Sequence, residues 1–336
     1  MTESNWANAL RSNQPIAAAI SAAKADQPKS AEGTFVLPSL TVGRGYRYGN
    51  LTWFPIFTDA PATQRQYATS AVAQGKVSVV EATTPTVGHL QVQNQLELPV
   101  LLFEGALLEG GWQHRAITRT VWVEANSQTQ IPVVCVEAGR WNGATLQSLG
   151  NKTAPARVRA AMRGMHRDHT GMAHQGQADQ SQVWNEVRNF AQATAKHRPT
   201  ESLVEMAQQL EKDIADLRLN APQPIFGQRG VMVAMAGRPL ALEVFDHQDT
   251  LAERLPSILD AFLPESLTQP YQQCTSSMAR TFVARVEKVG VMPTGETGRF
   301  RNDSDKYVAS EAVTTTAGEF LHLATLNAQH QVVLAA

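Results

Sequence analysis

Apolar and polar residues alternate in short runs through the first half of the chain, a pattern typical of half-buried β-strands. One run is continuously apolar, which indicates a strand buried on both faces. The runs lie at residues 51–57, 76–81, 89–93, 99–103, 121–123 and 131–136. Their spacing predicts a β-rich domain over residues 33–145, built as a sandwich or a barrel.

Beyond residue 180 the apolar residues recur every three or four positions, which indicates amphipathic helices. Residues 184–194 show one such pattern and residues 203–217 show a second. Ser202 and Glu205 have the spacing of a capping box, in which a hydroxyl and a carboxylate satisfy the first free N–H groups of a helix. We therefore expect a helical hairpin with its turn near Pro199.

The last third of the chain contains both the alternating pattern of strands and the three-to-four-residue pattern of helices. Residues 231–245 predict a β-hairpin, and Thr250 and Glu253 have capping-box spacing at the start of a helix. A further helix is predicted over residues 277–288 and a final hairpin over residues 319–334.

Together these patterns predict an α+β fold. A β-rich N-terminal sandwich or barrel-like domain is followed by a helical segment and a mixed α+β C-terminal part. In this interpretation residues 180–336 form a helical hairpin and an α+β region that packs on the first domain.

Two segments lack a clear period. Residues 1–32 are alanine-rich and predict a leader that is poorly ordered or forms a short helix. Residues 146–179 predict a basic linker, which we expect to be solvated and not phosphate-binding, since it has no aromatic residues to stack on bases near its positive charges. Those charges are Lys152, Arg157, Arg159, Arg163 and Arg167.

Composition and charge narrow the function classes. The chain has 29 Lys and Arg against 30 Asp and Glu, so no overall charge would attract nucleic acid or an anionic membrane. No stretch approaches the roughly 18 apolar residues of a membrane helix. Cys135 and Cys274 do not suit a disulfide framework or a zinc site. We expect a cytoplasmic protein without a metal site, while the cofactor stays unidentified and a homo-oligomer stays open.

Two predicted buried strands end in polar residues, and such strand ends are where sites are commonly built. The residues are Glu104, Trp112, Gln113, His114 and Arg115 at the first end, and Glu137, Arg140 and Trp141 at the second. If the two ends converge, carboxylates, guanidinium groups and aromatic rings share one site.

The run from Ile131 to Trp141 has the sequence IPVVCVEAGRW, and other notable segments are residues 45–51, 110–115, 182–184 and 230–245. Together they resemble a bacterial family named for its association with ADP-ribosylglycohydrolases and with rhodanese and phosphatase proteins. The resemblance covers most of residues 40–330, and the run from Ile131 to Trp141 is its specific part. It implies a cytoplasmic protein near ADP-ribose or NAD-derived metabolism.

The chain departs from the family pattern at two places. Family members tend to have Gly-Glu-Glu-Leu where residues 105–108 are Gly-Ala-Leu-Leu, and Lys-Gln-Asn-Arg where residues 112–115 are Trp-Gln-His-Arg. If the family's acids or its lysine take part in chemistry, this chain has lost that chemistry or uses Glu104, Glu109 and His114 instead.

The favoured hypothesis is a binding or regulatory module for a nucleotide-like or ADP-ribose-like ligand. Arg115 and Arg140 would hold phosphates, and Trp112 or Trp141 would stack on a ring, with Gln113 as a further contact. Binding is favoured over catalysis because the sequence supplies no activated nucleophile.

Two alternatives stay open. One is a hydrolase of an ADP-ribosyl or related bond, with Glu137 or Glu104 as general base and His114 as general acid. It predicts a carboxylate and an imidazole within hydrogen-bond reach in one pocket. The other is a structural or assembly protein, in which Arg115, Glu137 and Arg140 form a buried ion-pair network with no pocket around them.

Overall fold

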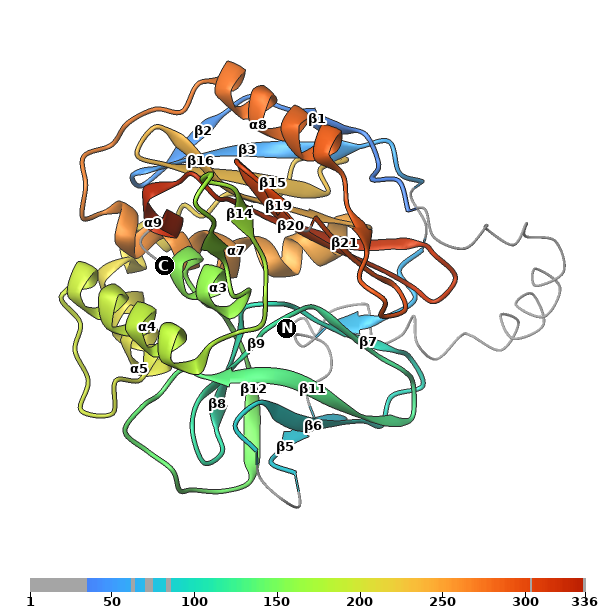
Figure 1. Cartoon of the computed structure of the whole chain (residues 1–336), viewed down its shortest axis with the longest axis vertical. Helices are drawn as coiled ribbons and strands as arrows, with labels where there is room; N and C mark the ends of the chain where they lie inside the picture. Colours follow the sequence, from blue (N-terminus) through green and yellow to red (C-terminus); the bar gives the residue numbers. More distant parts are fainter. Residues whose placement is uncertain (1–34, 62–63, 70–74, 83–85, 303, 335–336) are drawn as a thin grey trace, which may run out of the picture. The chain divides into compact units, whose positions relative to one another are not determined.

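The computed structural model describes residues 35–61, 64–69, 75–82, 86–302 and 304–334, and residues 35–336 cluster into one compact unit. The predicted α+β fold is confirmed, with an antiparallel barrel in the N-terminal half, helices after it and an antiparallel sheet that contains the C-terminal strands (Figure 1). The leader predicted over residues 1–32 lies outside the described residues.

Six antiparallel strands close the barrel in the order β11-β6-β5-β12-β8-β9. Alternate residues of a barrel strand face inward, and here Val79, Leu90, Val92, Leu108 and Ile131 form part of a fully buried apolar interior. The strands are β5 (Val77–Val80), β6 (His89–Asn94), β8 (Ala106–Gly110), β9 (Arg115–Ile117), β11 (Ser127–Cys135) and β12 (Leu146–Thr153).

A small sheet adds to the same apolar interior. It has the order β10-β7-β4, and Val100, Leu102 and Val123 from it belong to the barrel's apolar cluster. The strands are β4 (Ala68–Thr69), β7 (Val100–Leu102) and β10 (Val121–Val123).

The second half is built on a nine-stranded sheet, ordered β1-β3-β15-β16-β21-β20-β18-β17 with β2 paired to β3. Its first strands come from the N-terminal part of the chain, so β3 lies directly beside β15. The strands are β1 (Leu40–Val42), β2 (Tyr46–Tyr48), β3 (Leu51–Thr58), β15 (Gly230–Met235), β16 (Arg238–Phe245), β17 (Met292–Pro293), β18 (Arg299–Arg301), β20 (Val308–Thr314) and β21 (Phe320–Asn327).

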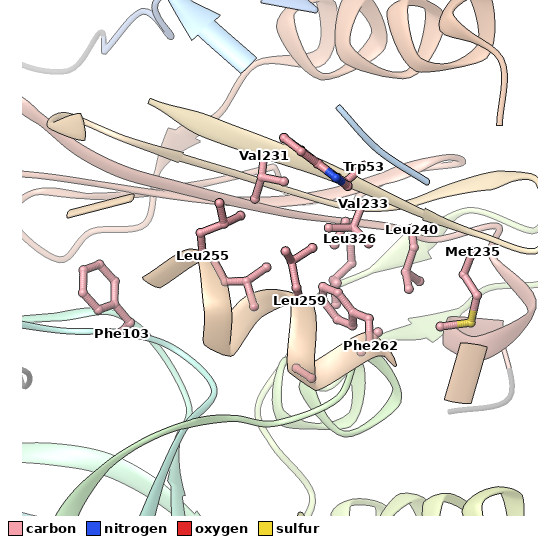
Figure 2. Close-up of a cluster of buried hydrophobic side chains, with 14 of the residues drawn as sticks. Trp53, Phe103, Val231, Val233, Met235, Leu240, Leu255, Leu259, Phe262 and Leu326 are labelled. Carbon is pink, nitrogen blue, oxygen red and sulfur yellow. The ribbon is translucent and has the colours of Figure 1, made fainter. Parts of the chain in front are cut away.

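Two helices cover opposite faces of this sheet because its strands alternate two sets of apolar side chains. Val231 and Val233 pack against α7 (Gln248–Ser266), whereas Met232 and Ala234 pack against α8 (Ser276–Val289). Figure 2 shows Leu255, Leu259 and Phe262 of α7 beneath the strands, with Phe103 from the end of β7 in the same cluster.

The predicted helical hairpin is present as α4 (Gln180–Thr194) and α5 (Leu203–Asp213). The Ser202 hydroxyl accepts a hydrogen bond from the Glu205 N–H at 3.2 Å, so this predicted cap is confirmed. The remaining elements are α3 (Ala156–Met162), α6 (Ala215–Arg218), α9 (Gln331–Leu334), β13 (His166–Arg167), β14 (Ala173–His174) and β19 (Ser304–Asp305).

Two local predictions are wrong. Helix α7 begins after His247, whose Nδ1 accepts from the Asp249 N–H, while the Thr250 hydroxyl bonds to Tyr67 and does not cap the helix. No hairpin forms over residues 319–334, since β21 pairs with β16 and β20 and the chain then enters α9.

The expectation that the basic linker is solvated is wrong for three of its arginines. Arg157, Arg159 and Arg163 belong to or follow α3, and each is at most 9% exposed. Each pairs with a buried glutamate, because a buried guanidinium needs an opposite charge. The domain boundaries proposed at residues 145 and 179 stay predictions.

Candidate functional site

The two polar strand ends meet at one end of the barrel. β9 and β11 are antiparallel partners, with Arg115 opposite Cys135. Just beyond these strands, the His114 backbone N–H donates to Glu137 Oε2 at 2.9 Å. The convergence that the sequence left open is therefore present.

Strand alternation identifies the side chains that enter the barrel. Ile117 and Val133 belong to the apolar interior, and residues two positions away on one strand share a face. Arg115 therefore shares the face of Ile117, and Cys135 shares that of Val133. Gln113 precedes β9, and its side chain bonds to Arg115.

Two more polar residues follow the same rule. Glu81 comes two positions after Val79, and Gln147 two positions before Leu149, which packs on the apolar interior. This end of the interior is thus closed by a set of buried side chains, here called the polar layer: Glu81, Gln113, Arg115, Cys135 and Gln147.

The polar layer is internally bonded. Arg115 Nη1 donates to Gln113 Oε1 at 2.9 Å and contacts the Cys135 sulfur, while its Nη2 lies 3.8 Å from Glu81 Oε1. Gln147 Nε2 donates to the Gln113 carbonyl at 3.0 Å. Burial raises the pKa of the Cys135 thiol to about 11, more than Arg115 lowers it, so this cysteine is a neutral packing group at pH 7.

The layer also holds polar atoms to which the described residues make no hydrogen bond. Among the described residues, Nε and Nη2 of Arg115, Oε2 of Glu81 and Oε1 of Gln147 make no hydrogen bond. Arg115, Glu81 and Gln147 are 0%, 6% and 3% exposed respectively. An unmade bond on such a buried group costs about 1–3 kcal/mol, so the polar layer is a candidate for contact with a ligand.

A tryptophan separates the polar layer from solvent. The Arg115 guanidinium carbon lies 5.3 Å from the centroid of the Trp141 ring, and Trp112 packs edge-on to Trp141 at 5.6 Å. The Trp141 side chain is 45% exposed. It therefore offers one aromatic surface to solvent directly above the buried arginine.

Arg140, predicted to bind ligand, is occupied by the protein. Its Nε and Nη2 donate to Glu137, its Nη1 to the carbonyls of Gly111 and Asn142, and its Nη2 also to the Gly110 carbonyl. A guanidinium has five N–H donors, and these contacts use them. Arg140 thus ties the β8–β9 turn to the loop after β11 and positions Trp141.

Glu137, which Arg140 contacts, also lies beside His114. Burial works against ionisation of Glu137, but hydrogen bonds from Arg140 and from the His114 N–H lower its pKa below the usual value. Burial lowers the pKa of His114 despite the neighbouring Glu137. At neutral pH the pair is a carboxylate next to an uncharged imidazole.

Ser202, His114 and Glu137 resemble a hydrolytic triad in composition only. His114 Nδ1 lies 2.7 Å from Ser202 Oγ and 3.5 Å from Glu137 Oε2, so both contacts fall on one ring nitrogen. A triad uses opposite nitrogens for the nucleophile and the acid. Ser202 is moreover fully buried and caps α5.

Glu104 belongs to a different cluster. Its carboxylate accepts from Arg163 at 2.8 Å and from Arg159 at 3.3 Å, and Arg159 pairs with Glu243 at 2.6 Å. Glu104 is therefore held in a buried ion network and does not join Glu137 and His114.

Sequence reasoning missed Glu81, Gln147 and Ser202. For Glu81 a signal exists: it continues the inward alternation of Val77 and Val79, so a carboxylate at that position enters the barrel. Gln147 follows an irregular loop, and nothing local in the sequence marks its orientation.

A polar cleft lies apart from the polar layer and is lined by none of its residues. This cleft of ≈ 690 Å³ is lined in part by Arg119, Glu296 and Arg299. Glu296 pairs with Arg119 at 2.6 Å and with Arg299 at 3.5 Å.

We find no group of three metal-ligating side chains in the described part of the chain. Over the same residues, no helix is long and apolar enough to cross a membrane.

One comparison with known proteins gives a match. The model of the ARPP-1 family, described as the ARG and Rhodanese-Phosphatase-superfamily-associated Protein domain, matches residues 39–326. No curated protein and no solved structure matches the chain. Since the match spans most of the sequence, the chain belongs to the ARPP-1 family.

Proposed function

With ARPP-1 membership as the premise, we propose that this protein is a cytoplasmic binding or regulatory module for a nucleotide-like ligand of the ADP-ribose or NAD-derived class. The ligand binds at the polar layer, beneath or in place of the Trp141 ring. The observation that carries the proposal is the fully buried Arg115, whose Nε and Nη2 have no hydrogen-bond partner in the part of the chain that is described.

The chemistry of the site supports this class of ligand. The ends of small barrels commonly hold ligands, with a few polar groups that fix orientation above an apolar interior. Arg115 and Glu81 supply the polar groups, and the exposed Trp141 ring supplies a stacking surface. A nucleotide combines a flat ring with hydrogen-bonding groups, so it matches both features.

Binding is favoured over hydrolysis for a geometric reason. The Glu137 carboxylate is bonded to Arg140 and to the His114 N–H, and Ser202 is buried as a helix cap. A general base must reach the proton that it removes, and these contacts hold Glu137 inside the protein. Intact ligand after prolonged incubation with the protein is the expected result.

The test is calorimetric titration of the full chain with ADP-ribose, NAD and AMP. We expect saturable binding of at least one of them. Trp141→Ala should weaken it about 5- to 100-fold, since loss of one stacking contact costs about 1–3 kcal/mol. Arg115→Lys should weaken it as well, because a lysine cannot reproduce the planar donor set.

A matched control separates the site from a general effect of losing charge or folding. Arg188→Ala removes an exposed arginine whose partner Glu201 is also exposed, and it should leave the titration unchanged. Because Trp141 lies on the surface, its variant should fold even if an Arg115 variant does not. Absence of binding by all three ligands to the folded wild-type protein would reject the proposed function.

A further inference from the structure

The unpartnered atoms of the polar layer also indicate which part of the ligand they contact. Resting on the function proposed above, we infer that this layer recognises the uncharged edge of a planar ring, a nucleobase or carboxamide edge that both accepts and donates hydrogen bonds. The phosphates of the ligand lie elsewhere. Arg115 is therefore a specificity residue for the ring and not a phosphate clamp.

The first argument is the balance of donors and acceptors. The unpartnered set contains two nitrogens that donate, Nε and Nη2 of Arg115, and two oxygens that accept, Oε2 of Glu81 and Oε1 of Gln147. The three residues that carry these atoms are neighbours, because Glu81 Oε1 lies 3.8 Å from Arg115 Nη2 and 3.4 Å from Gln147 Nε2. A group that fits must offer both acceptors and N–H donors.

The second argument is charge. Arg115 and Glu81 have opposite charges and lie side by side under almost complete burial, so the layer is close to neutral. A phosphate carries acceptor oxygens and a charge of about −1.5 to −2. It would satisfy Arg115, but its negative charge would face the Glu81 carboxylate, which has the same sign of charge. At this depth such a contact is strongly unfavourable.

An amide-like edge matches the unpartnered atoms in kind, since it offers both acceptors and N–H donors. Its ring nitrogen or carbonyl oxygen accepts from Arg115, and its N–H groups donate to Glu81 Oε2 and Gln147 Oε1. The ring to which the edge belongs then lies where Trp141 can stack on it, since that indole already covers Arg115 at 5.3 Å. The same edge occurs in a nucleobase and in a nicotinamide carboxamide.

The experiment compares neutral rings with phosphates on the full-length protein. Adenosine, guanosine and nicotinamide are the neutral probes, and ribose 5-phosphate and inorganic phosphate are the charged ones, with ADP-ribose and NAD as whole ligands. We expect at least one neutral probe to bind at least tenfold more tightly than either charged probe. The neutral probe that binds identifies the source of the edge.

The Glu81→Gln variant should change ligand affinity in opposite directions, depending on whether Arg115 contacts a neutral ring or a phosphate. Replacing the carboxylate with a near-isosteric amide loses an acceptor for the ligand's N–H, so binding of the neutral probe should weaken at least tenfold. If Arg115 instead held a phosphate, removal of the neighbouring negative charge would strengthen phosphate binding. Glu296→Gln, in the separate cleft, is the matched control and should change neither affinity.

The outcomes distinguish this inference from the proposed function. Binding of ribose 5-phosphate without any neutral probe, or tighter phosphate binding by Glu81→Gln, would overturn the inference while the proposed function stands. If NAD and ADP-ribose also fail to bind, the proposed function fails and the inference fails with it. Neutral binding that weakens in Glu81→Gln and persists in Glu296→Gln supports both.

Discussion

Arg115 and Arg140 belong to the same candidate site but differ in how many of their N–H groups are hydrogen-bonded. Arg140 donates its N–H groups to Glu137 and to three backbone carbonyls. These hydrogen bonds hold two loops together. Arg115 keeps donors unpartnered by the described residues although its side chain is fully buried. Arg140, the residue closer to solvent, is therefore held by acceptors of the protein itself, whereas the buried Arg115 has donors that the described residues do not fill.

The close contacts around Gly111 give a prediction at the residue scale. Gly111 has φ +56°, and a Cβ there would lie 1.8 Å from Gln147 Nε2. Gly111→Ala should therefore incur the left-handed backbone cost of about 1–2 kcal/mol and a further cost of about 1–3 kcal/mol for displacing Gln147. Chemical unfolding of the purified variant measures the loss.

Gly75→Ala is the matched control for this change. Gly75 has φ +85°, with nothing within 4 Å of the Cβ position, so this variant bears the backbone cost alone. The difference between the two variants measures the crowding at the polar layer. Equal losses in the two would show that Gln147 moves freely, which would contradict a fixed donor–acceptor layer.

The sequence could select these residues but could not assign their roles. Gln113, Arg115, Glu137, Arg140 and Trp141 were candidates from their place at two strand ends, and β9–β11 pairing does bring them together. Which arginine keeps unpartnered donors depends on the loop carbonyls around Arg140. Those positions follow from three-dimensional closure of the barrel and not from any local pattern.

Among the elements, helix α5 is connected to the candidate site through its capping residue, Ser202. Ser202 Oγ accepts from the Glu205 N–H at 3.2 Å and lies 2.7 Å from His114 Nδ1. The capping-box spacing predicted this N-terminus because the required groups are three residues apart. The similar spacing at Thr250 failed because a distant residue, Tyr67, bonds to that hydroxyl. Local signals hold only where no tertiary partner competes.

Ser202 both caps α5 and contacts His114, so its loss should affect stability twice. Ser202→Ala removes the cap, which costs about 1 kcal/mol, and leaves the buried His114 Nδ1 without its hydroxyl partner, which adds about 1–3 kcal/mol. We expect the free energy of unfolding to fall by about 2–4 kcal/mol, measured by urea denaturation. The melting temperature should fall with it.

Thr275→Ala is the corresponding control. Thr275 caps α8 by accepting from the Met278 N–H at 3.2 Å, and its loss should cost only the capping contribution. A loss in Ser202→Ala no greater than that in Thr275→Ala would mean that the His114 contact adds nothing to stability.

On the scale of the whole molecule, a buried ion network connects the two halves of the fold. Glu104 lies between β7 and β8, Arg159 and Arg163 come from the α3 region, and Glu243 lies on β16 of the large sheet. The paired residues are 55 positions (Glu104 and Arg159), 59 positions (Glu104 and Arg163) and 84 positions (Arg159 and Glu243) apart in sequence. Sequence reasoning expected the arginines in a solvated linker because their partners are not adjacent in the chain.

This network predicts a specific loss of stability in acid. Burial of the Glu243 carboxyl opposes ionisation, but Arg159 and His322 lower its pKa from 4.5 to about 2. Because the folded-state pKa lies below the unfolded value, the stabilisation is complete above about pH 5. It is lost as the pH falls from 4.5 towards 2.

Glu243→Gln isolates this contribution. At pH 7 the variant should lose about 3–5 kcal/mol, since it leaves Arg159 without one of its two carboxylates in the interior. The gap between wild type and variant should narrow as the pH falls from 4.5 towards 2, because over this range the unfolded wild-type chain binds a proton at Glu243 that the folded protein binds only near pH 2. Glu296→Gln, at a half-exposed pair, should cost less than about 1 kcal/mol at either pH. Calorimetric melting at pH 7 and pH 3 provides the measurement, and a gap that stays constant between these pH values would show that Glu243 is not ionised in the folded protein.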